Sequence, residues 1–254
     1  MRITRAVVPS LFTVLNMFCG FLSIIHASKG DVLQASWLII LAAGFDTLDG
    51  VMARITKSSS QFGVEIDSLS DVVSFGVAPA FLVYQVQLHA LEGFGILLSS
   101  LLMVFSGLRL ARFNVNLVGF DKDHFSGLPA PASALTVASF TINYWGATSG
   151  LGGAANILPY LVVALSLLMV SKVKYDTLPR ISRRSVQREP WKFIFLALAI
   201  VVVFVTAGEA IFPLFVLFIA LGIVRSFGSM VRHVLHHEQK GKEEEGAEPT
   251  GIDI

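Results

Sequence analysis

Four aspartates carry the chemistry that this 254-residue sequence can perform. Asp46 and Asp49 are three residues apart, and Asp67 and Asp71 are four apart, so each pair lies on one face of a helix. Each carboxylate at a bilayer centre costs about 2.5–3.5 kcal/mol, and converging carboxylates repel one another. Divalent cations with a preference for oxygen would remove this repulsion. Mg²⁺ or Mn²⁺ suits such ligands, and Ca²⁺ is a further candidate. Two ions would fit four carboxylates, and one ion beside a free carboxylate is the alternative.

Small residues and an arginine accompany the acids. Gly50 and Ala53 continue the first acidic stripe, and Gly63 opens the start of the second, so a bulky ligand could approach the helix backbone. Arg54 could pair with a phosphate. Cations, an arginine and a proton-accepting carboxylate are the groups that phosphoryl transfer requires. A small-residue packing seam at Gly50 and Ala53 is a structural alternative that is compatible with a site beside it.

The composition indicates an all-α polytopic membrane protein. Hydrophobic residues make up 54% of the chain and charged residues only 15%, which is below the quarter or so that is usual for globular proteins. The first apolar run is longer than a signal-peptide core of about 7–15 residues, so we expect a retained helix there. Eight spans are predicted, at about 11–27, 32–52, 67–88, 94–113, 132–145, 157–170, 191–206 and 211–227.

The charges predict the orientation in the membrane. With eight spans, every lysine and arginine except Lys29 falls on the side of the two termini. The positive-inside rule then places both termini and the acids at the cytoplasmic face of the inner membrane. The charged tail, residues 231–254, is expected to be solvated and disordered. A net charge of +1 gives no reason to expect a nucleic-acid partner, and the lone Cys19 excludes an internal disulfide.

A cation transporter is an alternative from a different functional class, because intramembrane carboxylates also mark ion pathways. The predicted acids lie at one membrane face rather than at the midplane. No broken-helix pair or internal repeat is evident in the sequence. Both observations favour the transferase chemistry.

The spacing from Asp46 to Asp71 resembles the signature of the CDP-alcohol phosphotransferase family without departure, D-x2-D-G-x2-A-R-x8-G-x3-D-x3-D. Within that family the chain resembles the CDP-diacylglycerol–serine O-phosphatidyltransferases. The glycerophosphate branch typically has proline and lysine where this chain has Ser68 and Val72. The resemblance covers about residues 9–175, and beyond the signature it is carried by segments 16–21, 67–79, 110–114 and 127–131.

The resemblance implies a six-helix bundle that dimerises in the membrane, here with two additional C-terminal helices. We therefore expect a transferase domain at 1–175, a basic loop with the extra helices at 176–230, and the tail at 231–254. The implied reaction is attack of the L-serine hydroxyl on CDP-diacylglycerol, which yields phosphatidylserine and CMP. Glycerol 3-phosphate or inositol phosphate as the acceptor is the alternative within the family.

The resemblance also implies roles for individual residues. Asp46, Asp49, Asp67 and Asp71 would hold two divalent ions, and Asp71 would also take the proton from the serine hydroxyl, which is a poor nucleophile at neutral pH. The CDP-diacylglycerol nucleotide would be lined by Gly50, Ala53, Arg54, Ser60 and Gly63. As a hypothesis, Arg109 or Arg112 binds the serine carboxylate, although both could instead be positive-inside anchors.

Overall fold

A computed structural model describes residues 7–56, 61–118, 127–145, 150–173, 175, 202–203, 205–206 and 208–245. Every regular element in this part of the chain is a helix. Within these residues, five helices are long and apolar enough to cross a membrane. The predicted all-α, polytopic class is therefore confirmed.

The first two spans form an antiparallel pair. Helix α1 covers Val7–Ser28 and helix α2 covers Val32–Thr56. The turn between them requires a left-handed residue, and Gly30 supplies it with a φ of 84°. Because α2 continues to Thr56, the first acidic pair lies within a helix.

The third span is a helix of changing pitch. It consists of α3 (Gln61–Asp71), a π-helical turn η1 (Val72–Val77) and α4 (Ala78–Val86). The span begins six residues before the expected start at Asp67, so the second acidic pair is also enclosed in a helix. In η1 the backbone N–H of Ala78 donates to the carbonyl of Val73, five residues back, which is the π-helical pattern.

The remaining elements complete the bundle. They are η2 (Leu88–Leu91), α5 (Glu92–Val118), α6 (Ala130–Tyr144), η3 (Gly152–Asn156), α7 (Leu158–Val170) and α10 (Ile211–Glu245). The predicted span at 191–206 lies almost wholly outside the described residues. Helix α10 continues to Glu245, through most of the segment that was expected to be a solvated tail, and the disorder of that tail stays a prediction. Extending an existing helix requires no new nucleus, and glutamate, lysine and glutamine favour helices.

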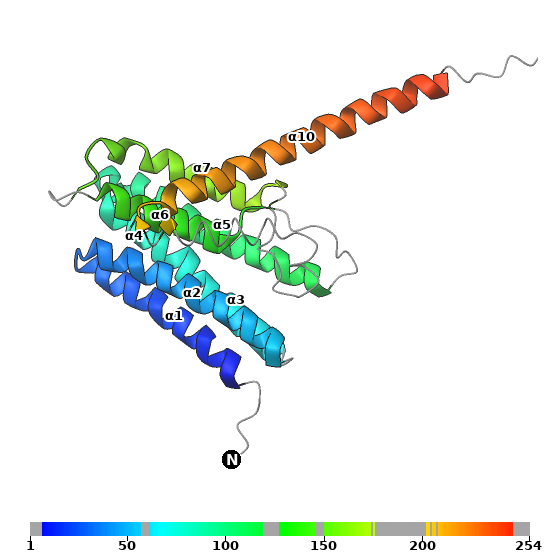
Figure 1. The fold of residues 1–254 in the computed structure, drawn as a ribbon. Coiled ribbons are helices and arrows are strands. Elements are labelled where there is room, and N and C mark those ends of the chain that lie inside the picture. The colour runs from blue at the N-terminus through cyan, green and yellow to red at the C-terminus, as the bar shows by residue number, and fades with distance from the viewer. Residues whose placement is uncertain are drawn as a thin grey trace, which may run out of the picture.

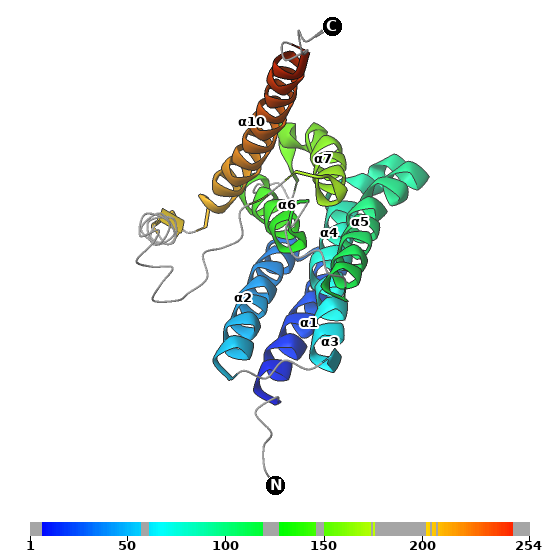
Figure 2. The ribbon, with the colours of Figure 1, turned by 90° about the vertical axis from the view of Figure 1, so that its right-hand side faces the viewer.

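Helix α1 lies between α2 and the third span (Figure 2), although α2 and α3 follow each other in sequence. Helix α5 packs against η1, α4 and α7, and α6 packs against α2 and α10. Beyond its contact with α6, α10 extends away from the bundle (Figure 1). The acidic pairs therefore meet beside α1.

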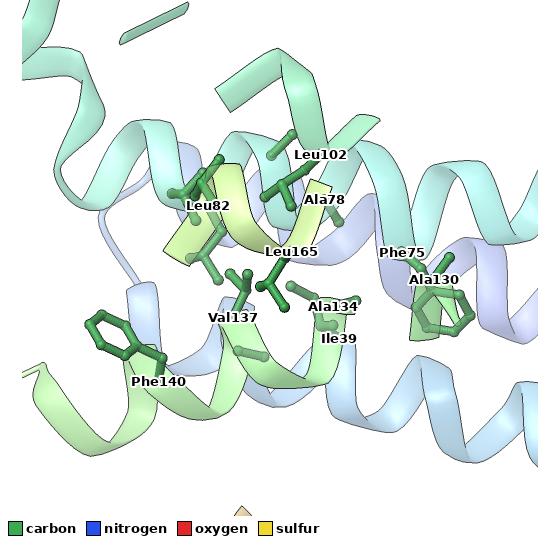
Figure 3. Close-up of a cluster of buried hydrophobic side chains, with 14 of the residues drawn as sticks. Ile39, Phe75, Ala78, Leu82, Leu102, Ala130, Ala134, Val137, Phe140 and Leu165 are labelled. Carbon is green, nitrogen blue, oxygen red and sulfur yellow. The ribbon is translucent and has the colours of Figure 1, made fainter. Parts of the chain in front are cut away.

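The apolar core lies where α2, the third span, α6 and α7 come together (Figure 3). Ile39, Phe75, Leu82, Val137 and Leu165 are each no more than 1% exposed. Since lipid is as apolar as these side chains, close packing rather than water exclusion must hold such helices together. Small residues permit the close approach, among them the buried alanines Ala78, Ala130 and Ala134.

Candidate active site

Three carboxylates from two helices converge. Asp46 of α2 and Asp67 and Asp71 of α3 each offer an oxygen, and these oxygens lie within 4.8 Å of one another. Among the residues whose side chains are described, no lysine or arginine forms an ion pair with this group. Three half-buried carboxylates without an ion-paired cation among these residues form a donor set that fits a divalent ion with a preference for oxygen.

Asp49 lies beside this group rather than in it. Its side chain is 7% exposed and accepts a hydrogen bond from the Thr13 hydroxyl of α1. Its other oxygen, Oδ1, is buried without a hydrogen-bond partner. Because an unsatisfied buried carboxylate oxygen is costly, this atom also fits a site for a cation. Asp49 remains close enough to interact electrostatically with Asp46 and Asp67.

Helix α1 contacts the second acidic pair through Asn16. The Asn16 Nδ2 donates to Asp71 Oδ1 at 3.4 Å, and Asn16 is fully buried. Sequence reasoning assigned no role to Asn16 or Thr13. The only signal was that Asn16 stands in segment 16–21, which carried part of the family resemblance, and Thr13 had no comparable signal.

Backbone contacts fix α1 against the third span at this point. The Ser70 hydroxyl donates to the Thr13 carbonyl at 3.0 Å, and the Ser74 hydroxyl donates to the Asn16 carbonyl at 2.8 Å. A Cβ on Gly20 would lie 2.7 Å from Ser74 Cα, so only glycine allows this approach. The two α1 residues that touch the acids are thus held by the span that carries Asp71.

Helix α5 supplies the cationic side of the site. The Arg109 guanidinium interacts electrostatically with the Asp71 carboxylate, and its Nε is buried without a hydrogen-bond partner. Arg112 is exposed. The structure therefore separates two arginines that the sequence left equivalent, and it brings only Arg109 towards the carboxylates.

The residues expected to line a nucleotide are only partly described. Gly50 is exposed on α2, and Ala53 and Gly63 are half-buried near the ends of α2 and α3 that flank the acids. The side chain of Arg54 and all of Ser60 lie outside the described residues. Their predicted roles stay predictions.

The π-helical turn begins directly after Asp71. Its Ser74, Phe75 and Gly76 are buried, and a Cβ on Gly76 would lie 3.4 Å from the Ser106 side chain of α5. Turns of this kind occur often at functional sites. No residue pattern predicts this turn, because a shift from i−4 to i−5 hydrogen bonding needs no distinctive residues.

Comparison with known proteins agrees with this geometry. The model of the CDP-alcohol phosphatidyltransferase family matches residues 6–170, a range that includes α1 to α7 and all four aspartates. The chain belongs to this family. It is thus a membrane transferase, and the match ends at the C-terminal residue of α7, before α10.

Three curated relatives of this phosphatidyltransferase illustrate the similarity. A CDP-diacylglycerol–serine O-phosphatidyltransferase of Helicobacter pylori is 33% identical over 233 residues, which cover 90% of this chain and 94% of the relative. The enzyme of the same name from Bacillus subtilis is 32% identical, covering 72% and 98% of the two chains. An archaetidylserine synthase of Methanothermobacter thermautotrophicus is 41% identical, covering 66% and 68%.

Proposed function

We propose that this phosphatidyltransferase transfers the phosphatidyl group of CDP-diacylglycerol to the hydroxyl of L-serine, giving phosphatidylserine and CMP. The observation that carries the proposal is the convergence of Asp46, Asp67 and Asp71 in a chain of this family. The choice of serine is supported by relatives that carry the name of the serine enzyme over nearly their whole length.

The acidic residues would hold two Mg²⁺ or Mn²⁺ ions, with Ca²⁺ as the alternative. Asp46, Asp67 and Asp71 provide the converging oxygens, and the unpartnered Oδ1 of Asp49 provides a further one. When bound, such ions offset the charge of the diphosphate and stabilise the CMP leaving group.

Asp71 would accept the proton of the serine hydroxyl. Asn16 donates to its Oδ1 and helps to hold the carboxylate in place. Arg109 would bind the serine carboxylate, since its buried Nε lacks a partner and its charge lies near Asp71. The nucleotide would contact the segment with Gly50, Ala53, Arg54, Ser60 and Gly63.

The proposed setting is the cytoplasmic face of the inner membrane, with both termini on that side. Soluble serine could meet a lipid-anchored donor there. Lysine and arginine are concentrated on this side of the predicted topology, which supports the orientation. A homodimer is proposed from the family resemblance.

The experiment offers the purified protein, in mixed micelles with CDP-diacylglycerol and Mn²⁺ or Mg²⁺, one acceptor at a time. The acceptors are L-serine, glycerol 3-phosphate and inositol phosphate, and CMP release is measured. We expect release with serine, none without an acceptor, and none after EDTA treatment until metal is restored.

Each other result has a definite meaning. CMP release with glycerol 3-phosphate or inositol phosphate, but not with serine, would show that the phosphorylated alcohol is the acceptor. A lack of CMP with any acceptor, together with metal-ion flux in proteoliposomes, would favour the cation transporter. Activity that survives EDTA would refute the metal-assisted mechanism.

A further inference from the structure

A hydrogen-bonded pair connects the two helices that flank the site. Ser68 of α3 directly follows Asp67, and Asn114 of α5 lies five residues after Arg109. Asn114 Nδ2 donates to Ser68 Oγ at 3.0 Å. Ser68 Oγ lies 3.0 Å from the Val64 carbonyl and 3.4 Å from Asn114 Oδ1. A hydroxyl has one proton, and the shorter distance directs it to Val64, so Asn114 is the donor and Ser68 the acceptor.

The pair joins helices whose backbones rest mainly on different neighbours. Helix α3 packs against α1 and η1, whereas α5 packs against η1, η2, α4 and α7. The two helices therefore share η1 as their common support, just beyond Asp71. About one helical turn before η1, the Ser68–Asn114 bond links them through side chains.

We propose that Ser68 and Asn114 are a positioning pair that sets the gap between Asp71 and Arg109, and thereby the affinity for the acceptor. This inference rests on the proposed function, in which the acceptor contacts both of those residues. Serine separates its hydroxyl from its carboxylate by only two carbon atoms. So short a molecule cannot contact Asp71 and Arg109 at the same time if α5 moves away from α3. Small misplacements of reacting groups strongly reduce the reaction rate. CDP-diacylglycerol would be held by α2, α3 and its lipid tails, and so depends less on this gap.

The test measures the KM of both substrates in Asn114→Ala, Ser68→Ala and the double variant. Loss of one neutral hydrogen bond should raise the KM for serine by about fivefold. The KM for CDP-diacylglycerol should stay within about twofold. Since both changes remove the same bond, the double variant should resemble either single variant. Ser68→Thr retains the hydroxyl and should restore the wild-type KM.

A second readout tests positioning directly. Homoserine carries one more methylene between its hydroxyl and its amino-acid group, so a widened gap should penalise it less than serine. We expect the ratio of kcat/KM for serine over homoserine to fall about fivefold in Asn114→Ala. Ser100→Ala is the matched control, because the Ser100 hydroxyl donates only to the Leu97 carbonyl of its own helix.

The outcomes separate the inference from the function on which it rests. A wild-type protein that releases no CMP with serine would refute the proposed function. If the wild-type protein is active with serine and the serine KM is unchanged in Asn114→Ala, only the positioning role of Ser68 and Asn114 is refuted. Equal increases in both KM values, together with a lower melting temperature, would also refute it, because they indicate a purely structural bond. Should Asn114→Ala fail to fold, Asn114→Leu keeps a similar size, removes both the N–H donor and the carbonyl acceptor, and is tested in the same way.

Discussion

Asp71 is the carboxylate on which the most contacts converge. Asn16 donates to it from α1, Arg109 interacts with it from α5, and Asp46 and Asp67 lie beside it. A side chain held from several directions keeps a fixed orientation, which proton transfer requires. The proposed base is therefore best tested by a change that keeps this shape.

Asp71→Asn keeps the size of the side chain and removes the proton acceptor. We expect kcat to fall by about 10²- to 10⁴-fold in the CMP-release assay, with an unchanged circular dichroism spectrum. Asp31→Asn is the matched control, because Asp31 lies in the exposed turn at the opposite end of α1 and contacts His26 at 3.3 Å. A fall in kcat of less than tenfold in Asp71→Asn would exclude Asp71 as the base.

The two arginines of α5 provide a second matched pair. Arg109→Ala removes a half-buried charge that interacts with Asp71, whereas Arg112→Ala removes an exposed one from the same helix. A charge-assisted hydrogen bond to the serine carboxylate predicts a KM for serine that is about 10- to 100-fold higher in Arg109→Ala. Substrate titrations that show equal effects of the two changes would mean that both arginines are membrane-face anchors.

At the scale of elements, α1 is a scaffold for the acids as well as a membrane span. Its Thr13 and Asn16 use their carbonyls to bind Ser70 and Ser74 and their side chains to bind Asp49 and Asp71. The convergence of Asp46 with Asp67 and Asp71 could be predicted from the sequence, since helical spacing fixes which residues share a face. The contribution of α1 could not, because its partners are 36 and 55 residues away and nothing local encodes them.

Gly20→Ala tests this scaffold. The added methyl group would lie 2.5 Å from Ser74 Oγ and 2.7 Å from Ser74 Cα, so α1 must move away from η1. Overpacking of this kind costs about 1–3 kcal/mol, and we expect a lower melting temperature together with reduced CMP release. Gly44→Ala is the control, since its added Cβ meets nothing within 4 Å. Identical melting curves for Gly20→Ala and Gly44→Ala would show that α1 and η1 are not tightly packed at Gly20.

At the scale of the whole molecule, the long helices place the acids and the Lys29 turn at opposite ends. The acids lie near the end of α2 and within α3, and the Lys29 turn joins the opposite ends of α1 and α2. Hydrophobic length predicted these spans well, because a bilayer imposes it directly. It could not predict the pitch change in the third span or the extension of α10, which depend on packing and on helix propagation.

Cysteine labelling of intact cells tests which end faces the cytoplasm. We expect Lys29→Cys to react with a membrane-impermeant maleimide from outside. Glu65→Cys, exposed two residues before Asp67, should react only after the membrane is permeabilised. The native Cys19 is 4% exposed, so wild-type protein gives the background. The reverse labelling pattern would place the acids on the outer face.

The π-helical turn after Asp71 also determines which changes in chain length the third span tolerates. Each residue of an α-helix rotates the chain by about 100°, so the wider turn sets the phase between the acids before it and the core residues after it. Deleting one residue within Val72–Val77 could restore a regular helix. The wider turn holds one residue more than a regular turn, so the shortened segment would rotate the chain by about the same angle. Asp71 and the buried Leu82 would then keep their relative directions. Deleting one residue within Val72–Val77 can therefore be absorbed, whereas an insertion there, or a deletion elsewhere in the third span, would turn the acids away from the core.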